Sequence, residues 1–255
     1  MSTDQGPVPA DDPGSVAAVY EDGGIAASYL QERMRFSWQR LLHRSQVRAL
    51  NQAIAVHRPA TVLEVAPGPA RLSVELHGIT RGVMVENSAE MIGIARNRLA
   101  QAKLGDVWTV LRGDAFDLQQ LVPSERFELA YTFRFIRHFR DDDRTRLYEQ
   151  LRQKLAPSGL LMLDVVNETH ARQRKPSGIA IHDACYSASG FVQEMKSNGF
   201  EVLSLTPILR HFRIQAFLSY KLDDIWPSVI EPLIGHLERI PSSDPLEWIA
   251  LCRKR

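Results

Sequence analysis

The chain has 255 residues, of which 44% are hydrophobic, and its formal net charge at pH 7 is +1. This length and composition suit one globular α/β domain with or without a cap, and the small net charge predicts no affinity for nucleic acid or a membrane surface. The two cysteines are far apart in the sequence, which excludes a disulfide framework. The sequence shows neither an apolar signal segment at its start nor an apolar run long enough to span a membrane, so we expect a cytoplasmic protein.

The N-terminal part is predicted to be a polar tail followed by helices. Residues 1–15 are rich in proline, glycine and polar side chains, and we expect them to be disordered. Residues 16–56 place Leu30, Met34 and Trp38 at helical spacing, which predicts one or two helices. We interpret this second segment as an N-terminal helical cap.

Short apolar runs then alternate with helical patterns. Helices are expected at 88–103, 141–155 and 187–200. This order predicts an α/β fold with a mostly parallel sheet and helices on both faces, whose core comprises residues 57–206 and 246–255. The runs that favour strands are 61–66, 82–86, 107–115, 127–133, 159–167, 201–209 and 247–255.

Residues 207–245 separate the last two predicted strands and therefore form an insertion. Pro227 suits the first turn of a helix there, and Pro232 should kink or divide that helix. The helix is compatible with packing on the sheet edge, with a cap that closes over an acceptor, or with the face of a homodimer. Its apolar stripe at helical spacing is formed by Trp226, Val229, Ile230, Leu233, Leu237 and Ile240.

Acidic residues stand near the carboxyl ends of the first three strands, where parallel sheets bind ligands. Glu64 precedes the loop around Gly68, Glu86 closes the second strand, and Asp114 lies at the end of the third. Glu86 is placed to accept both hydroxyls of a ribose, and Asp114 to accept the amino group of an adenine. This pattern predicts a cofactor that contains adenosine.

The loop after the first strand distinguishes among such cofactors. A dinucleotide needs backbone N–H groups aimed at its pyrophosphate, but Pro67 and Pro69 have none. S-adenosylmethionine carries a sulfonium and no phosphate, so this loop suits it better. Ala66 and Ala70 flank Gly68, and each would be strained by about 1–2 kcal/mol if its backbone had to be left-handed.

Five segments between residues 61 and 167 resemble the class I S-adenosylmethionine-dependent methyltransferases: VLEVAPGPARLSVEL, GVMVENSAEMIGIARNRL, VLRGDAFDL, FELAYTFRFIRHF and LAPSGLLMLDVVN. The resemblance implies a Rossmann-like fold with a seven-stranded sheet and S-adenosylmethionine as the cofactor. It assigns the loop positions to Glu64, Ala66, Gly68 and Ala70, the adenosine contacts to Glu86, Asn87, Met91, Asp114 and Ala115, the methionine end to Thr132 and Phe133, and the neighbourhood of the cofactor carboxylate to Tyr29 and Arg33.

The resemblance also implies that a methyl group is transferred to an acceptor by in-line displacement, which proximity and exclusion of water promote. No N/D-P-P-Y/F sequence follows the fourth strand, which favours a small-molecule acceptor methylated on oxygen or carbon. His138 is the candidate general base if the acceptor is a hydroxyl, and His182 and His211 are weaker candidates. We expect no metal ion.

Some interpretations stay open at this point. Arg134 and Arg137 either bind an anionic acceptor or form surface ion pairs. The glycine-poor loop is also compatible with a non-catalytic relative that acts as a binding or regulatory protein. A nicotinamide oxidoreductase is a third class, and the loop prolines argue against it.

Overall fold

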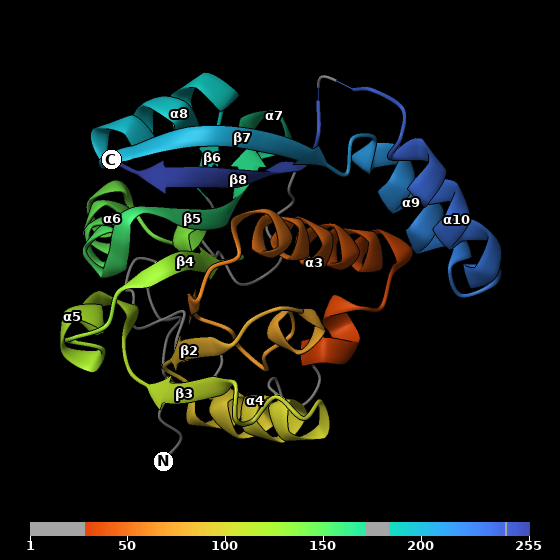
Figure 1. Ribbon diagram of the computed structural model, residues 1–255. Coiled ribbons are helices and arrows are strands. Elements are labelled where there is room, and N and C mark those ends of the chain that lie inside the picture. Colours follow the sequence, from red (N-terminus) through yellow and green to blue (C-terminus); the bar gives the residue numbers. More distant parts are fainter. Residues whose placement is uncertain (1–28, 172–183, 243) are drawn as a thin grey trace, which may run out of the picture.

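The computed structural model describes residues 29–171, 184–242 and 244–255 (Figure 1). The expected disordered tail, residues 1–15, and His182 lie outside these residues. Within these residues the sheet has the strand order β3-β2-β1-β4-β5-β8-β7, and β8 runs antiparallel to both of its neighbours, β5 and β7. The strands are β1 (Thr61–Val65), β2 (Arg81–Glu86), β3 (Trp108–Arg112), β4 (Phe127–Thr132), β5 (Leu155–Asn167), β6 (Cys185–Tyr186), β7 (Phe200–Ile208) and β8 (Glu247–Lys254).

Helices cover both faces of this sheet, as the alternating pattern predicts. The α-helices are α3 (Ser37–His57), α4 (Ala89–Gln101), α5 (Leu118–Leu121), α6 (Asp141–Lys154), α7 (Glu168–Ala171), α8 (Ala188–Ser197), α9 (Phe212–Leu222) and α10 (Pro227–Leu237). Short 3-10 helices lie at η1 (Ser73–Glu75), η2 (Ala115–Asp117) and η3 (Ile136–His138), and residues 29–33 are also helical.

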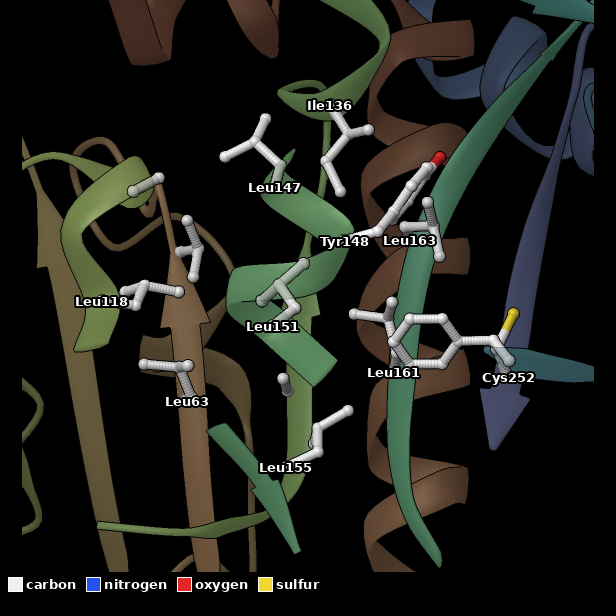
Figure 2. Packing of buried hydrophobic residues seen from close by; sticks show 14 of the residues in the cluster. Leu63, Leu118, Ile136, Leu147, Tyr148, Leu151, Leu155, Leu161, Leu163 and Cys252 are labelled. Atoms are coloured by element: carbon white, nitrogen blue, oxygen red, sulfur yellow. The ribbon is translucent and has the colours of Figure 1, made fainter. Parts of the chain in front are cut away.

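The core has two parts because neighbouring strand residues point to opposite faces. On β1, Val62 belongs to the cluster that includes side chains of α3 and α4, whereas Leu63 belongs to the cluster with α6 and α8. Figure 2 shows Leu147 and Leu151 of α6 packing toward the strands in this second cluster. The strands are therefore apolar on both faces, which explains their near-continuous hydrophobic sequences.

In the described part of the chain the sheet has eight strands, whereas the sequence predicts seven. The additional strand, β6, has only two residues, and it pairs in parallel with Val166 and Asn167 at the end of β5. β4 pairs with β5 only as far as Leu163, so the last residues of β5 extend beyond it. A two-residue strand shows no periodicity, and only this tertiary pairing reveals it.

The insertion forms α9 and α10, which pack against each other and against α3 at one end of the molecule (Figure 1). Pro227 is in the first turn, as expected, and α10 continues through Pro232, so the helix is not divided there; a kink at Pro232 stays a prediction. Ile230 of the predicted stripe is buried, whereas Trp226 and Val229 are exposed. The assignments of this insertion as a cap or as a dimer face stay predictions.

In the described part of the chain, no helix is long and apolar enough to cross a membrane.

Candidate functional site

A pocket lies at the carboxyl ends of β1, β2, β3 and β4. The strand order changes direction between β1 and β4, and ligands of open α/β sheets bind beside such a point. Most of the residues selected from the sequence meet in this pocket. Those that line it are Tyr29, Glu64, Ala66, Gly68, Glu86, Asn87, Met91, Asp114, Ala115, Phe133 and His138.

The loop after β1 has an unusual backbone. Ala66, Gly68 and Ala70 all have positive φ, at 54°, 57° and 53°. The two alanines therefore stand in the left-handed conformation, where the sequence predicts strain of about 1–2 kcal/mol each. The loop keeps the shape that glycines would adopt easily, and it passes close to the pocket despite its two extra methyl groups.

Glu86 ties this loop to the end of β2. Its Oε2 accepts the backbone N–H of Gly68 at 2.9 Å, and its Oε1 accepts those of Asn87 and Ser88 at 3.0 Å each. Burial raises the pKa of Glu86, and these three backbone hydrogen bonds oppose that rise. The carboxylate is thus fixed in position at the pocket wall and keeps lone pairs for further donors.

The wall near β3 is formed by residues with more exposed side chains. Asp114 is exposed at the pocket, and its Oδ1 accepts the backbone N–H of Phe116 at 2.9 Å. Ala115 follows it and is buried. Asn87 is exposed, whereas Met91 is buried in the first turn of α4, where its backbone N–H is capped by Ser88 Oγ. This part of the pocket therefore has polar side chains, Asp114 and Asn87, beside the apolar side chains of Ala115 and Met91.

Glu64 is a buried carboxyl group in the wall formed by β1. It accepts a hydrogen bond from Ser73 Oγ, and the hydroxyl of Tyr131 lies 3.1 Å from that same Oγ. Burial raises the pKa of Glu64 to about 7, against the opposing effects of these hydroxyls and of Arg71. The group can therefore gain or lose a proton near neutral pH.

A group of arginines surrounds Tyr29 at the same end of the pocket. The guanidinium of Arg33 stacks over the Tyr29 ring at 5.2 Å. Burial by itself raises the pKa of the Tyr29 hydroxyl, but the fields of Arg33, Arg71 and Arg134 together lower it below its usual value. Of these arginines, Arg71 and Arg134 line the pocket. This end of the pocket is consequently electropositive.

Arg71 is held from behind by α3. One of its Nη atoms lies 2.5 Å from His43 Nδ1, and the other donates to Gln46 Oε1 at 2.8 Å. Because a guanidinium can only donate, His43 must accept through Nδ1 and donate through Nε2 to Glu75 Oε1, at 2.7 Å. Burial and Arg71 lower the pKa of His43, which agrees with a neutral ring.

Phenylalanine rings form a further part of the pocket wall. Phe139 meets Phe135 and Phe116 edge-to-face, with ring centroids 5.0 and 5.4 Å apart, and all three line the pocket together with Phe133 and His138. Phe116, Phe135, Phe139 and Arg71 were not predicted from the sequence to belong to the site. The three phenylalanines in the sequence FRFIRHF could have predicted this wall, whereas no sequence pattern around Arg71 indicates that it belongs to the site.

Several candidates from the sequence stand elsewhere. Thr132 is buried and does not line the pocket, and Arg33 does not line it either but lies over the ring of Tyr29, which does. His211 also lies outside the pocket, with Nε2 at 3.1 Å from the carbonyl of Ile240. Arg137 is not a surface residue: it is 4% exposed in η3, does not line the pocket, and pairs with Asp164 and Glu247.

Among the residues that the structure describes, no group of three or more His, Cys, Asp and Glu side chains could hold a metal ion.

Comparison with known families and structures agrees with this geometry. A family model described as a methyltransferase domain matches residues 62–159. A search of curated proteins gives no match.

Solved structures of similar fold include magnesium protoporphyrin IX methyltransferase from Synechocystis PCC 6803, which contains S-adenosylhomocysteine, with 10% identity and a TM-score of 0.62. The alignment covers 96% of this chain and 100% of that one.

An O-methyltransferase family protein from Burkholderia thailandensis has 11% identity and a TM-score of 0.57, over 84% of this chain and 56% of that one, so the present chain spans just over half of its length. The glycopeptide N-methyltransferase MtfA has 19% identity and a TM-score of 0.57, over 83% of this chain and 95% of that one. At these identities, the structures establish the fold and leave the acceptor to be argued from the site.

Proposed function

We propose that this chain methylates a small-molecule acceptor on oxygen or carbon, with S-adenosylmethionine as the methyl donor. Its methyltransferase domain has the fold of the class I methyltransferases. The observation that supports this most is the pocket in which Glu86, Asp114 and Glu64 meet a base candidate, His138. A fold alone does not specify an activity, so the proposal depends on these groups.

The polar groups of the pocket fit S-adenosylmethionine in their chemistry. Glu86 would accept the ribose hydroxyls, Asp114 the adenine amino group, and Glu64 the ammonium of the methionine part. The loop prolines offer no N–H groups for a pyrophosphate, and this cofactor has none. Tyr29, with Arg33 stacked on it, would lie near the cofactor carboxylate.

The residues of the chain then have a limited chemical task. When bound, S-adenosylmethionine supplies a methyl group on a sulfonium, whose sulfur leaves with the bonding electron pair. The phenylalanine wall would exclude water and orient the acceptor for in-line attack. If the acceptor is a hydroxyl, His138 would take the proton that it loses. An acceptor that reaches the pocket already deprotonated, whether at oxygen or at carbon, would not need this base.

The preference for oxygen or carbon comes from the segment immediately after β4. The sequence there is FRFIRHF, and it lacks the asparagine or aspartate followed by two prolines that is typical of amino-group methylation. MtfA shares the fold and is an N-methyltransferase, so this preference depends on the local sequence and not on the fold.

Calorimetric titration with S-adenosylhomocysteine tests the cofactor site. The wild type should bind, and Glu86→Gln should bind at least about tenfold more weakly, because charge-assisted hydrogen bonds contribute roughly 1.5–3 kcal/mol. Glu90→Gln is the matched control, since Glu90 is exposed two residues into α4 and does not line the pocket.

Other outcomes would change the proposal in defined ways. If the folded wild type does not bind S-adenosylhomocysteine, the cofactor assignment fails, and protection from thermal unfolding by NAD would support an oxidoreductase. If the cofactor binds but no methyl group reaches any hydroxyl- or carbon-acceptor in a panel, the chain is a binding or regulatory protein.

A further inference from the structure

Arg134 follows β4 by two residues and has a strained backbone. Its φ is 60°, in the left-handed region that a residue with a Cβ seldom adopts. Its N–H donates to Asp164 Oδ1 at 2.5 Å, which holds the chain in this conformation. Strain of this kind persists where the surrounding structure enforces it, and it often marks a functional position. In this backbone conformation the side chain of Arg134 lines the pocket.

The guanidinium of Arg134 has an unsatisfied donor. Its Nε is buried and has no hydrogen-bond partner among the described residues. The residue as a whole is partly exposed at the pocket, but a buried N–H donor without an acceptor is unfavourable, so an acceptor on a ligand is expected to complete it. Burial and the neighbouring Arg137 and Arg33 lower the pKa of Arg134 to about 9, which still leaves it charged at neutral pH.

The neighbouring arginines are already engaged. Arg71 donates to His43 and Gln46, and Arg137 pairs with Asp164 at 3.2 Å and with Glu247 at 3.4 Å. Arg33 lies over the ring of Tyr29. Among the described residues, Arg134 thus differs from Arg71 and Arg137 because it combines a place in the pocket lining with a guanidinium that no ion pair or side-chain hydrogen bond engages.

Arg134 and Arg71 both lie in the fields of Tyr29 and Arg33, which are expected near the cofactor carboxylate. Arg71 lies in addition in the field of Glu64, and Arg134 in those of Arg137 and Glu247. Phe133 and Phe135 flank Arg134 in the chain and line the pocket, as does His138. Of these residues, Phe135 and His138 are expected around the acceptor and Phe133 at the methionine end of the cofactor, so Arg134 lies where the two ligands would meet.

On the basis of the proposed function, we infer that Arg134 binds an anionic group of the acceptor, and that the enzyme therefore acts on a small acid, with a carboxylate beside a flat apolar body. A guanidinium pairs with a carboxylate through two parallel hydrogen bonds and would orient the acceptor as well as attract it. The phenylalanine wall supplies the surface for the apolar part.

Two carboxylates could reach Arg134: that of the acceptor and that of the cofactor's methionine. The first measurement separates them by comparing S-adenosylhomocysteine with methylthioadenosine, which has the same nucleoside and sulfur but no amino acid. We expect Arg134→Met to leave the affinity for both ligands within about twofold of the wild type. Weaker binding of S-adenosylhomocysteine alone would assign Arg134 to the cofactor and overturn the inference.

The second measurement probes the acceptor site in protein saturated with S-adenosylhomocysteine. Benzoate should bind at least about tenfold more tightly than benzamide, its uncharged counterpart, because only the carboxylate forms a charge-assisted pair. Arg134→Met should remove this preference and Arg134→Lys should retain part of it. Arg213→Met, which removes an exposed charge on α9, is the control and should keep the preference.

A third variant distinguishes ligand binding from a structural role. Arg134→Gly relieves the left-handed backbone, so it should raise the melting temperature while it abolishes the preference for benzoate. Equal binding of benzoate and benzamide by the wild type, or no benzoate binding, would overturn the inference while the cofactor site stands. Failure of the wild type to bind S-adenosylhomocysteine would instead refute the proposed function.

Discussion

Glu64 is the residue whose titration should be visible in the stability of the protein. Its pKa in the folded chain is about 7, raised from 4.5 chiefly by burial. Between these two values the folded state binds more protons than the unfolded state. The stabilising contribution is therefore complete below about pH 4.5 and is lost as the pH rises to about 7, by an amount on the order of 3 kcal/mol.

We predict that Glu64→Gln removes this pH dependence, because glutamine is of similar size and does not ionise. The free energy of unfolding in urea, measured at about pH 5 and about pH 8, should fall less in the variant than in the wild type. Glu201→Gln, at an exposed position on β7, should retain the slope of the wild type. An identical slope in Glu64→Gln would contradict the prediction.

The protein should become more stable when Ala66 is replaced by glycine. Relief of its left-handed backbone contributes about 1–2 kcal/mol, and the greater freedom of glycine in the unfolded chain costs about 0.4–1 kcal/mol. Ala66→Gly should therefore raise the free energy of unfolding by roughly 0.5–1 kcal/mol, with a higher melting temperature. Ala55→Gly, in the helical backbone of α3, should lower it by about 0.5–1 kcal/mol, and a loss at both positions would refute the strain argument.

At the scale of elements, α3 depends on the end of α9. Asp223 is 6% exposed and follows α9, and its carboxylate accepts the backbone N–H of Ser37 at 2.5 Å and the Ser37 hydroxyl at 2.6 Å. Ser37 is the first residue of α3, so a carboxylate from the insertion occupies the positive end of that helix. The insertion thereby fixes the helix whose His43 and Gln46 hold Arg71 at the site.

Asp223→Ala is predicted to lower the free energy of unfolding by about 1–3 kcal/mol, since it leaves buried donors without an acceptor. Asp224→Ala removes the neighbouring exposed carboxylate and should change stability by no more than about 0.5 kcal/mol. Chemical denaturation of both variants tests this, and equal effects would show that Asp223 does not cap α3.

At the scale of the whole molecule, the C-terminal strand lies inside the sheet. β8 pairs with β5 on one side and with β7 on the other, and Ile249, Ala250 and Cys252 are buried. The last strand in the sequence thus joins the parallel half of the sheet to β7. Its removal would expose two unpaired strand edges.

A chain that lacks residues 247–255 should therefore fail to fold cooperatively and should aggregate. Circular dichroism during heating and the soluble fraction on expression measure this. Deletion of residues 1–15, which the sequence predicts to be disordered, should leave the melting temperature unchanged. A cooperative transition in the C-terminally truncated chain would contradict the role assigned to β8.

Local sequence patterns were sufficient to predict the order of strands and helices, the parallel sheet and most of the pocket. These patterns are short apolar runs, caps such as Ser88, and acids at the ends of strands that must converge on one edge. The seven main strands and the residues Glu64, Gly68, Glu86 and Asp114 were accessible in this way.

Other features became visible only in the folded chain: the left-handed conformation of Ala66 and Ala70, the paired state of Arg137, and the two-residue strand β6. The fold also brings Arg71 and Arg134, far apart in sequence, together around Tyr29. Such features arise from packing between distant segments, and no periodicity along the chain encodes which buried charges find partners and which await a ligand.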